Sequence, residues 1–454
     1  MACGEKAGVI GLGYIGLSTA MAYAREKVSV VGYDVSTAKV TAVNLGELSE
    51  VLPELEGWVG YPLAAVSSYI NATTDWLEFV RQGPSTVFIA VNTERDGVPW
   101  LEPLAETLSR VLQDLPQALV VVESTVIPGT LQTLVKAEDR GRVFHAPRRD
   151  WFVSPERNLR VLPRLVGCWL PGRIAEALAD LSIVCDHLLP CAVEEAEVAK
   201  STENALQHLL MTFASELAWA YPRIDLRRVM ELTGTHWRIE RTWRPGFGTG
   251  GYCIPIAGQY LLKGSDHLTQ LRTLAAAQQS EEHNLNLLAR MLADRMPQPL
   301  AILGITYREG LGVLTHSVGT RLLDLYSHNR DLSVYWHDPM VKGDLFDAKN
   351  RQALLEAEMG VEQEARPTRL VKMSVRAQSV TEALALARTV LLCAPHAEYK
   401  HIPAIAVAMG LAGTLKTQYL IDESGLLAGD VGTLEALGIT YAAAGQVMPW
   451  NKVG

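Results

Sequence analysis

The sequence lacks the features that mark several classes of protein. Its six cysteines are scattered and form no CxxC pair or cysteine–histidine cluster, so we expect neither a metal site nor a disulfide framework. No apolar run reaches the roughly 18 uninterrupted residues of a membrane span. The first residues show no charged segment followed by an apolar stretch and a cleavage site. These absences predict a cytoplasmic protein that binds no metal and no membrane.

Positive charge is also in short supply. Lys and Arg number 41 against 50 Asp and Glu, which gives a formal net charge of −9. This balance argues against a nucleic-acid binder and against a basic membrane-surface protein. It is compatible with an anionic ligand, because glycine loops and a few arginines can hold phosphates. The length of 454 residues, with 48% hydrophobic and 20% charged residues, predicts a globular protein of two to three domains.

The clearest motif is a dinucleotide-binding fingerprint near the start of the chain. It consists, in order, of a predicted strand over Ala7–Ile10, the turn GLGYIG, a helix over Leu17–Glu26, a strand over Val28–Tyr33 and Asp34. We expect Gly11 to make the tight bend, Gly13 to let a pyrophosphate approach and Gly16 to pack helix against strand. Tyr14 and Ile15 complete the predicted loop. Asp34 would bind the ribose hydroxyls and repel a 2′-phosphate, which favours NAD; the alternative is a similar turn without a ligand.

Two further strands end in small polar residues. The strand expected over Thr86–Val91 runs into Asn92 and Thr93, and the strand over Ala118–Val122 runs into Glu123, Ser124 and Thr125. Ligands of open α/β sheets bind at the carboxyl ends of strands, so Thr93, Ser124 and Thr125 are candidate cofactor contacts. The alternative for Ser124 and Thr125 is that one of them caps a helix after Pro128.

The middle of the chain changes to a helical period. Glu194–Tyr221 predicts a long helix on which Lys200 and Asn204, four apart, share a face. Lys200 could reach solvent or bind an oxyanion. Before this helix, Glu156 is either an exposed loop acid or a functional carboxylate. Further helices are expected over Asp225–Thr233 and Leu271–Met296, and two long apolar helices suit a bridging domain and a dimer core.

Between these helices lies GFGTGGYCIP, Gly246–Pro255. Four glycines at 246, 248, 250 and 251 let the backbone approach a ligand closely. A helix that follows would direct its partly positive N-terminus at Cys253 and favour the thiolate. A thiolate beside such a turn suits covalent catalysis on an aldehyde. The alternative is a buried structural cysteine.

A second α/β unit begins near Gln298. Strands are expected over Pro299–Ile305, Leu332–Trp336, Thr389–Cys393 and Tyr419–Asp422, with a helix over Val318–Ser327 and an exposed insertion over Glu356–Thr368. This half has no GxGxxG, so it is expected to bind something other than the dinucleotide, with Tyr307 and Arg308 at a strand end. The predicted fold is α/β: two Rossmann-like doubly wound domains, residues 1–192 and 297–454, joined by a central helical domain, residues 193–296.

Together these motifs resemble the UDP-glucose/GDP-mannose dehydrogenase family of nucleotide-sugar 6-dehydrogenases. The resemblance rests on GLGYIGL with Asp34, ESTVIPGT at 123–130, SPERN at 154–158, PRLVG at 163–167, AEVAKSTEN at 196–204 and GTGGYCIP, with weaker similarity in LGITYR, VYWHDP and CAPHAEYK. The SPER segment is similar to that of members that act on 2-acetamido sugars.

The resemblance implies an oxidoreductase that converts the sugar C6 alcohol to a carboxylate with two NAD. It implies that Cys253 forms a thiohemiacetal and then a thioester, that Lys200 and Asn204 stabilise the oxyanion, that Thr125 positions water and that Glu156 assists proton transfer. The expected contacts to the nucleotide sugar are Glu156, Arg157, Lys200, Asn204, Arg244, Gly248, Gly250, Gly251, Tyr307 and Arg308. UDP-glucose, dTDP-glucose and UDP-N-acetylhexosamines are the candidate substrates, and a homodimer is expected.

The chain also departs from the family pattern. Ala257 stands where the family has an aspartate soon after the cysteine, and Leu206-Gln207 stands where it has tyrosine-arginine. Thr315 replaces an arginine, and the family's DxR segment is Asp422-Glu423-Ser424. These departures keep two alternatives open: a dehydrogenase that stops at the aldehyde, and a catalytically silent binder of sugar nucleotides.

Overall fold

The structure is a computed structural model of the 454-residue chain. It describes residues 6–49, 51–52, 54–95, 97–150, 157–239, 242–267, 270–326, 332–341, 343 and 374–451. The expected insertion over Glu356–Thr368 lies outside these residues. The chain divides into two compact units. Unit 1 consists mainly of Met1–Glu203 with Gln259–Leu268, and unit 2 contains the rest of the described chain.

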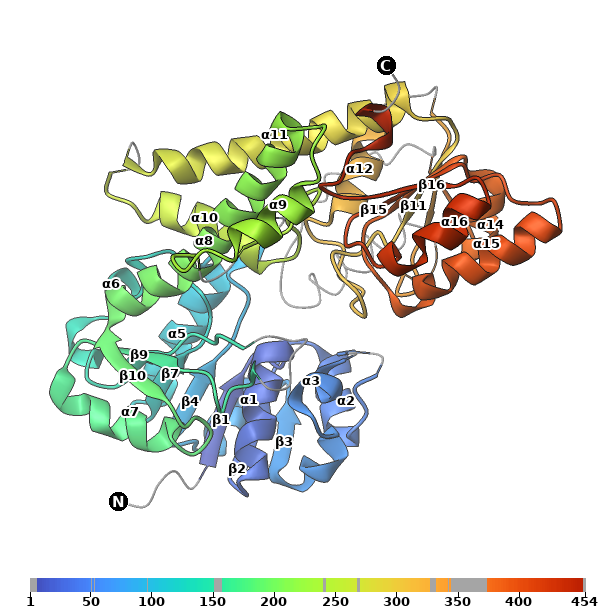
Figure 1. The fold of residues 1–454 in the computed structure, drawn as a ribbon. Coiled ribbons are helices and arrows are strands. Elements are labelled where there is room, and N and C mark those ends of the chain that lie inside the picture. The colour runs from blue at the N-terminus through green and yellow to red at the C-terminus, as the bar shows by residue number, and fades with distance from the viewer. Residues whose placement is uncertain are drawn as a thin grey trace. The chain divides into compact units, whose positions relative to one another are not determined.

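Unit 1 is built on an eight-stranded sheet in the order β10-β9-β8-β7-β4-β1-β2-β3 (Figure 1). Its strands are β1 Lys6–Ile10, β2 Ser29–Tyr33, β3 Ile70–Thr73, β4 Thr86–Ile89, β7 Leu119–Val122, β8 Val143–His145, β9 Arg164–Cys168 and β10 Leu188–Ala192; Glu94–Arg95 (β5) and Val98–Pro99 (β6) form a separate ribbon. Its helices are α1 Tyr14–Arg25, α2 Thr37–Leu45, α3 Leu55–Val59, α4 Trp76–Arg81, α5 Glu102–Asp114, α6 Thr130–Leu134 and α7 Ile174–Leu181.

The central strands of this sheet pair in parallel and are short and apolar. β4 reads TVFI and is buried at all four positions, as expected for a strand covered on both faces. It lies between β1 and β7, and both pairings are parallel. The sheet changes direction once, where His145 of β8 pairs antiparallel with Gly167 of β9. The carboxyl ends of β1, β4 and β7 therefore meet at one edge.

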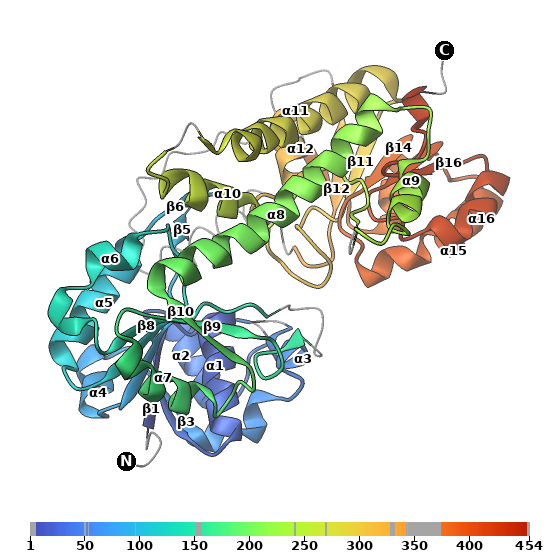
Figure 2. The ribbon, with the colours of Figure 1, turned by 60° about the vertical axis from the view of Figure 1, so that its left-hand side comes forward.

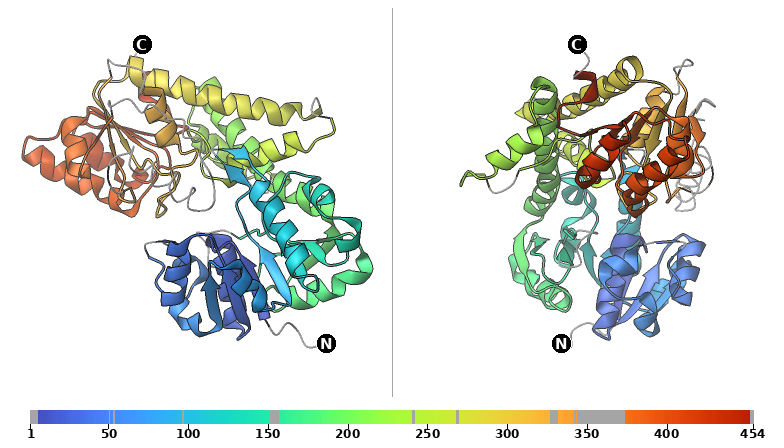
Figure 3. Two further views of the ribbon diagram at one scale, coloured as in Figure 1. Left: turned by 180° about the vertical axis from the view of Figure 1, so that it is seen from behind. Right: turned by 45° about the vertical axis from the view of Figure 1, so that its right-hand side comes forward.

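Unit 2 contains a six-stranded, fully parallel sheet in the order β13-β12-β11-β14-β15-β16. The C-terminal part of this unit is drawn in orange to red in both views of Figure 3. Its strands are β11 Leu300–Leu303, β12 Val334–His337, β13 Ser374–Arg376, β14 Thr389–Leu392, β15 Tyr419–Asp422 and β16 Thr440–Ala443, and its helices include α12 Val318–Tyr326, α14 Val380–Leu386, α15 Ile402–Leu411 and α16 Val431–Ala436. This is the strand order of doubly wound dinucleotide-binding folds. The predicted fold class, with two Rossmann-like sheets, is confirmed.

The two sheets share one local arrangement at the end of their second strand. In unit 1, Asp34 follows β2 and accepts hydrogen bonds from the amides of Leu12, 2.7 Å, and Ser36, 2.9 Å. In unit 2, Asp338 follows β12 and accepts from the amides of Thr306, 2.9 Å, and Met340, 2.8 Å. In each unit a buried carboxylate thus ties the turn after the first strand to the end of the second.

The remaining helices come from the middle of the chain. They are α8 Val193–Ala220, α9 Leu226–Thr233, α10 Cys253–Lys263 and α11 Arg272–Arg295. Figure 2 shows α8 as one continuous helix, which confirms the long helix predicted there. β10 ends at Ala192 and α11 ends at Arg295, next to the expected domain boundaries. The division into three domains at those residues stays a prediction.

Candidate active site

The glycine turn after β1 has the backbone that its sequence predicts. Gly11 has a φ of +88°, and a Cβ there would lie 2.4 Å from the carbonyl oxygen of Ala90. A Cβ on Gly16 would lie 1.9 Å from the carbonyl oxygen of Gly11. No protein atom lies within 4 Å of the Cβ position of Gly13, so this glycine faces open space. Two glycines are needed by the fold itself, and the third leaves room for a ligand such as a pyrophosphate.

The first helix starts earlier than predicted. The expected start was Leu17, but α1 begins at Tyr14 with Gly13 as its N-cap. The amide of Leu17 already donates to the carbonyl of Gly13, 2.9 Å, so Tyr14 and Ile15 form the first turn of α1. The free amides of a helix N-terminus suit an anion, which places the predicted loop residues where a dinucleotide phosphate would bind.

Asp34 lies at the end of β2, buried and fixed by two backbone amides. Lys39 of α2 adds an ion pair, with 3.6 Å between Nζ and the nearer Asp34 oxygen. The carboxylate is therefore fixed at the end of β2, directly after the strand, as the motif predicts. Sequence reasoning missed this ion pair. The signal that could have suggested it is the position of Lys39 on the helix after β2, five residues after Asp34.

The polar residues after β4 and β7 come together as predicted. The hydroxyl of Thr93 donates to the carbonyl of Thr125, 2.5 Å, and the hydroxyl of Ser124 donates to the carbonyl of Val91, 2.7 Å. Tyr260 of α10 donates to the carbonyl of Thr93, 2.7 Å. The helix-capping alternative is wrong, because α6 begins at Thr130 and its N-cap is Gly129. Ser124 and Thr125 thus belong to the edge of the sheet where ligands bind.

A buried ionic cluster underlies this edge, and sequence reasoning missed it. Glu123 is 2% exposed and accepts hydrogen bonds from Arg164 of β9 and from Thr19 of α1. Arg148 binds Asp150 through both carboxylate oxygens, at 2.8 and 2.7 Å. It also donates to Ser18, 3.1 Å. The signal was present in Arg164, a charged residue inside an apolar strand. The cluster ties α1 to the ends of β7, β8 and β9.

His145 is the last residue of β8. It is fully buried, and its Nδ1 lies 3.1 Å from the carbonyl of Val122. Because a carbonyl only accepts, Nδ1 carries the proton. Burial, with smaller contributions from Arg164 and Lys200, lowers the pKa of His145 to about 4. His145 is therefore neutral at physiological pH and adds no charge near the Lys200 ammonium.

Lys200 and Asn204 both lie on α8 and are both half-buried. Their spacing of four residues places them on one side of the helix, as predicted. On the next turn, Glu203 forms an ion pair with Arg149, 2.6 Å. Among the ion pairs of the described residues, Glu203 contacts Arg149 and not Lys200.

Cys253 is the first residue of α10 and is exposed. The prediction that a helix follows the glycine turn is confirmed, and the buried-cysteine alternative is wrong. A negative charge at the start of an 11-residue helix is stabilised by the amides and dipole of its first turn. The side chain is thus placed as a nucleophile would be.

The glycines before Cys253 pack on Tyr307. Gly251 has a φ of +79°, and a Cβ there would lie 2.8 Å from the Tyr307 ring. A Cβ on Gly250 would lie 2.9 Å from the Cβ of Tyr307. Burial raises the pKa of Tyr307, against an opposing effect from Arg308. The structure therefore brings Tyr307 and Arg308 to the glycine turn, as the sequence analysis expected.

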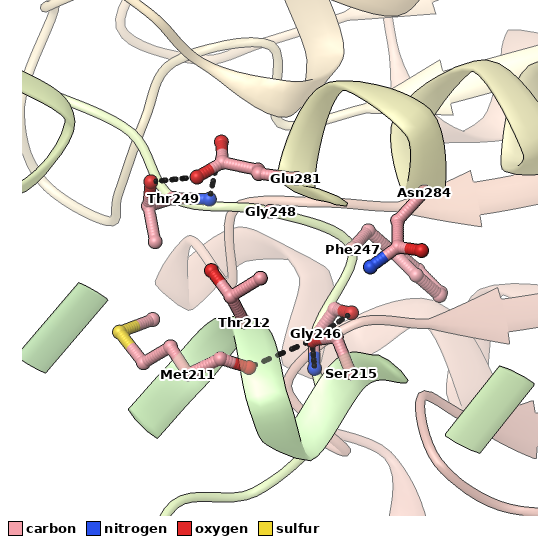
Figure 4. Close-up of a pocket in the computed structure, with 9 residues that line it drawn as sticks. All are labelled: Met211, Thr212, Ser215, Gly246, Phe247, Gly248, Thr249, Glu281 and Asn284. Atoms are coloured by element: carbon pink, nitrogen blue, oxygen red, sulfur yellow. Dashed lines mark hydrogen bonds between the residues drawn. The ribbon is translucent and has the colours of Figure 1, made fainter. Parts of the chain in front are cut away.

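The other end of the turn is held by residues that sequence reasoning missed. Figure 4 shows Gly246 bonded to Ser215, and Thr249 bonded to Glu281. These residues line a small cavity with Met211, Thr212, Phe247, Gly248 and Asn284. Glu423, after β15, accepts from the amide of Phe247, 3.1 Å. Glu281 gave no sequence signal. Glu423 was noted only as part of the segment that replaces the family's DxR motif, and nothing in the sequence links either residue to 246–253.

The structure does not test the site roles of the remaining predicted residues. Glu156 lies outside the described residues. Arg157 and Arg244 are exposed. Within the described ranges, no group of three or more His, Cys, Asp or Glu side chains could hold a metal ion. No helix in that part of the chain is long and apolar enough to cross a membrane.

Comparison with known proteins agrees with this geometry. Residues 5–157 match the NAD binding domain of the UDP-glucose/GDP-mannose dehydrogenase family, and residues 194–283 match its central domain. UDP-N-acetyl-D-mannosamine dehydrogenase of Pyrococcus horikoshii is 26% identical over 376 residues, 74% of this chain and 84% of the relative. NDP-N-acetyl-D-galactosaminuronic acid dehydrogenase of Ralstonia nicotianae is 27% identical over 366 residues, 74% of this chain and 83% of the relative.

Solved structures show the same fold. A UDP-D-ManNAc dehydrogenase from Pyrococcus horikoshii superposes with a TM-score of 0.76 at 20% identity, covering 97% of this chain and 99% of that one. A UDP-glucose dehydrogenase from Pyrobaculum islandicum superposes with a TM-score of 0.75 at 22% identity, covering 97% and 98%.

Proposed function

The chain belongs to the UDP-glucose/GDP-mannose dehydrogenase family and is an NAD-dependent nucleotide-sugar dehydrogenase, and on this basis we propose that it oxidises the C6 alcohol of a nucleotide sugar to a carboxylate. The observation that carries the proposal is Cys253, exposed at the N-terminus of α10 behind its glycine turn. A dehydrogenase that stops at an alcohol–aldehyde step needs no such nucleophile.

The residues of the β1 turn fit the cofactor. Gly13 leaves open space, the N-terminus of α1 suits a phosphate, and Asp34 suits ribose hydroxyls. Thr93, Ser124 and Thr125 lie at the same sheet edge and are the remaining proposed contacts. When bound, NAD supplies the acceptor for a hydride from the sugar carbon.

Cys253 would act after the first oxidation. Loss of one hydride and one proton turns the C6 alcohol into an aldehyde. The thiolate of Cys253 adds to the aldehyde carbon and forms a thiohemiacetal, whose oxygen takes up a proton. Loss of that proton and a second hydride gives a thioester. Water then adds to the thioester carbon, the thiolate leaves, and the carboxylate is released, so that two NAD are reduced for each sugar.

Lys200 and Asn204 would stabilise the oxygen of the tetrahedral species. An ammonium and an amide N–H are suitable donors to an oxyanion, and both side chains lie on one side of α8. Thr125 would help to position the water, and Glu156 would assist proton transfer during hydrolysis. Ala257 is buried at 1% exposure and carries no titratable group, so this position contributes nothing to proton transfer.

The proposed substrate is a UDP-N-acetylhexosamine, because relatives from two species are named for N-acetylated sugars. UDP-glucose and dTDP-glucose are the alternatives. The proposed contacts to the nucleotide sugar are Glu156, Arg157, Lys200, Asn204, Arg244, Gly248, Gly250, Gly251, Tyr307 and Arg308. Of these, Tyr307 and Arg308 have the strongest support, since Tyr307 packs directly on the glycine turn.

The test is NADH release with UDP-glucose, dTDP-glucose and UDP-N-acetylhexosamines, followed by product mass. The proposal expects two NADH per sugar and a mass gain equal to one oxygen less two hydrogens. Acid formation by Cys253→Ala should fall at least about 1,000-fold, because no thioester forms. Undiminished acid formation by this variant would contradict the covalent mechanism.

A second candidate is favoured by Ala257. If hydrolysis needs a carboxylate at that position, the enzyme would release the aldehyde, with one NADH per sugar. A third candidate is a silent binder, for which sugar nucleotides would bind without any NADH. The ratio of NADH to sugar, measured beside a binding isotherm, separates all three.

We also propose a homodimer in the cytoplasm. Leu206, Leu210 and Phe213 of α8 are 55%, 46% and 55% exposed and follow helical spacing. An apolar stripe of this kind is commonly covered by a partner, and a second copy of α8 would supply a matching one. Of the cysteines in the described ranges, none forms a disulfide, which agrees with a reducing compartment.

A further inference from the structure

The segment Gly246–Cys253, here called the cysteine loop, has little rigidity of its own. Four of its eight residues are glycine, and glycine restricts the backbone least. Behind Gly246–Thr249 lies the cavity of Figure 4, where the hydroxyl of Thr212 and the amide nitrogen of Asn284 have no partner among the described residues. Phe247 is buried in the core of unit 2, and the glycines and Thr249 on either side of it depend on particular hydrogen bonds for their position.

Glu281 of α11 makes the most complete of these contacts. One oxygen accepts the amide of Thr249, 3.2 Å, and the other accepts the Thr249 hydroxyl, 2.6 Å. The first oxygen also accepts from Arg321 of α12, 2.7 Å, and the second from Nε2 of His208 of α8, 2.5 Å. Four donors thus saturate one carboxylate. Two of them belong to the cysteine loop and two to neighbouring helices.

The charge on this carboxylate is held in place. Glu281 is 8% exposed and His208 is 1% exposed. Burial by itself would raise the pKa of Glu281, but the hydrogen bond from His208 and the charge of Arg321 prevail and lower it to about 2. Glu281 is therefore ionised at neutral pH, and it accepts hydrogen bonds without donating any.

The partners of Glu281 are anchored from outside the loop. Arg321 also binds Glu282, 2.6 Å, whose side chain is 60% exposed. His208 comes from α8 and Arg321 from α12, so the carboxylate is fixed by two helices besides its own. Removing Glu281 would leave both donors and both Thr249 groups without their acceptor, which is costly at a buried site.

The other loop contacts involve only backbone groups of the loop. The hydroxyl of Ser215 donates to the carbonyl of Gly246 and accepts from its amide, Glu423 accepts from the amide of Phe247, and the carbonyl of Thr315 accepts from the amide of Gly251. Only Glu281 binds one loop residue through both its backbone and its side chain among these described contacts. Thr249 lies four residues before Cys253, so Glu281 binds the loop close in sequence to the thiol.

We propose that Glu281 is a positioning residue for Cys253. Its carboxylate, which is held by His208 and Arg321, binds both the amide and the hydroxyl of Thr249. This contact keeps the cysteine loop in the conformation that places the thiol at the start of α10. The inference rests on the proposed nucleophilic role of Cys253. A displacement of about 1 Å in a reacting group can lower the rate on the order of 100-fold. Loss of the Glu281–Thr249 contact is therefore expected to lower the catalytic rate by a similar factor.

The test compares four variants with the wild-type chain. Glu281→Gln and Thr249→Val weaken the hydrogen bonds between residues 249 and 281, and Thr249→Ser keeps them. Glu282→Gln is the matched control, since it makes the same change on the same helix and also contacts Arg321, but it does not touch the loop. Thermal melting and circular dichroism establish that each variant folds. If Glu281→Gln does not fold, Thr249→Val carries the test, because it removes only one hydroxyl.

The first readout is the rate at which iodoacetamide alkylates Cys253, with the rate of Cys253→Ser subtracted. We expect about a tenfold decrease in Thr249→Val and Glu281→Gln, and wild-type rates in Thr249→Ser and Glu282→Gln. This readout needs neither NAD nor a sugar. The second readout is NADH release, where we expect kcat to fall on the order of 100-fold in the first two variants with little change in KM.

Folded Thr249→Val and Glu281→Gln proteins with wild-type alkylation rates would overturn the inference. Wild-type kcat in both would overturn it equally. If the wild-type chain releases no NADH from any tested sugar nucleotide, the proposed function fails, while the alkylation rates still decide whether Glu281 positions the thiol. Loss of alkylation in Glu282→Gln as well would also count against it, because the effect would then follow from any change near Arg321.

Discussion

At the scale of single residues, Asp34 combines two tasks. Its carboxylate fastens the turn after β1 through the amides of Leu12 and Ser36, and it neutralises Lys39 at 3.6 Å. The same charge would meet the ribose of the cofactor. Changing the charge while keeping an acceptor separates these tasks, because the amide of asparagine can still accept a hydrogen bond.

Asp34→Asn should shift the cofactor preference towards NADP. The substitution removes a negative charge that repels a 2′-phosphate and leaves Lys39 without its carboxylate. We expect the ratio of kcat/KM for NADP to that for NAD to rise by about tenfold or more. A tenfold change corresponds to about 1.4 kcal/mol in the relative transition-state stabilisation with the two cofactors. Initial rates with both cofactors give this ratio. Asp430→Asn, an exposed change, is the control, and an unchanged ratio in Asp34→Asn would contradict the assignment of the ribose site.

Glu423 gives the structure a pH dependence. Burial and the neighbouring Asp422 raise its pKa to about 8, although the amide of Phe247 opposes the shift and Glu281 lies near. The folded protein therefore binds more protons than the unfolded chain between about pH 4.5 and 8, so this residue makes stability fall as pH rises through that window. We expect the melting temperature of Glu423→Gln to fall less between pH 5 and pH 8 than that of the wild-type chain. Glu138→Gln, a change at an exposed position, is the reference. If the melting temperatures of Glu423→Gln and the wild-type chain change equally with pH, the raised pKa of Glu423 is refuted.

At the scale of elements, the turn between β1 and α1 offers a matched pair of substitutions. Gly13→Ala puts a methyl group where no protein atom lies within 4 Å, and Gly16→Ala puts one 1.9 Å from the carbonyl oxygen of Gly11. We expect Gly13→Ala to melt within a few degrees of wild type but to lose at least about tenfold in NAD affinity. Gly16→Ala should lose several degrees even without NAD. Melting curves with and without NAD check both. Equal NAD affinity in Gly13→Ala would remove the pyrophosphate from this position.

The elements that sequence reasoning predicted share one property: their signals are local. Each of these elements has a clear apolar period or a turn motif within one continuous stretch of sequence. Examples are the strand before GLGYIG, the long helix that carries Lys200 and the helix that begins at Cys253. Boundaries were less accurate, as at Tyr14, because the helical hydrogen bond from Leu17 to Gly13 leaves no mark on the pattern of apolar residues.

What could not be predicted depends on contacts between distant stretches. Thr249 and Glu281 are separated by 32 residues, and Phe247 and Glu423 by 176, so no pattern within either stretch reveals the pairing. The same holds for Glu123 and Arg164 beneath the sheet edge of unit 1. A charged residue inside an apolar segment signals that a partner exists, but the tertiary fold decides which residue it is.

At the scale of the whole molecule, the exposed stripe on α8 predicts association. Phe213→Glu places a charge at one end of the stripe formed by Leu206, Leu210 and Phe213, so a dimer formed through this face should dissociate. We expect sedimentation equilibrium to give a dimer for the wild-type chain and a monomer for the variant. Leu411→Glu, at an apolar position that is 88% exposed, is the control and should stay dimeric. A wild-type monomer would remove the proposed dimer, and a dimeric Phe213→Glu would move it to another face.

The paired carboxylates Asp34 and Asp338 have a consequence for how an acid at this position is interpreted in a sequence. In both units an aspartate directly after the second strand accepts from two backbone amides, one in the turn after the first strand and one two residues beyond the aspartate, but only the first unit has GxGxxG. Asp338 therefore contributes to folding in a unit that has no glycine-rich phosphate turn. An aspartate at the end of a second strand is thus no evidence of a dinucleotide site by itself, and the glycine turn beside it is the feature that indicates one.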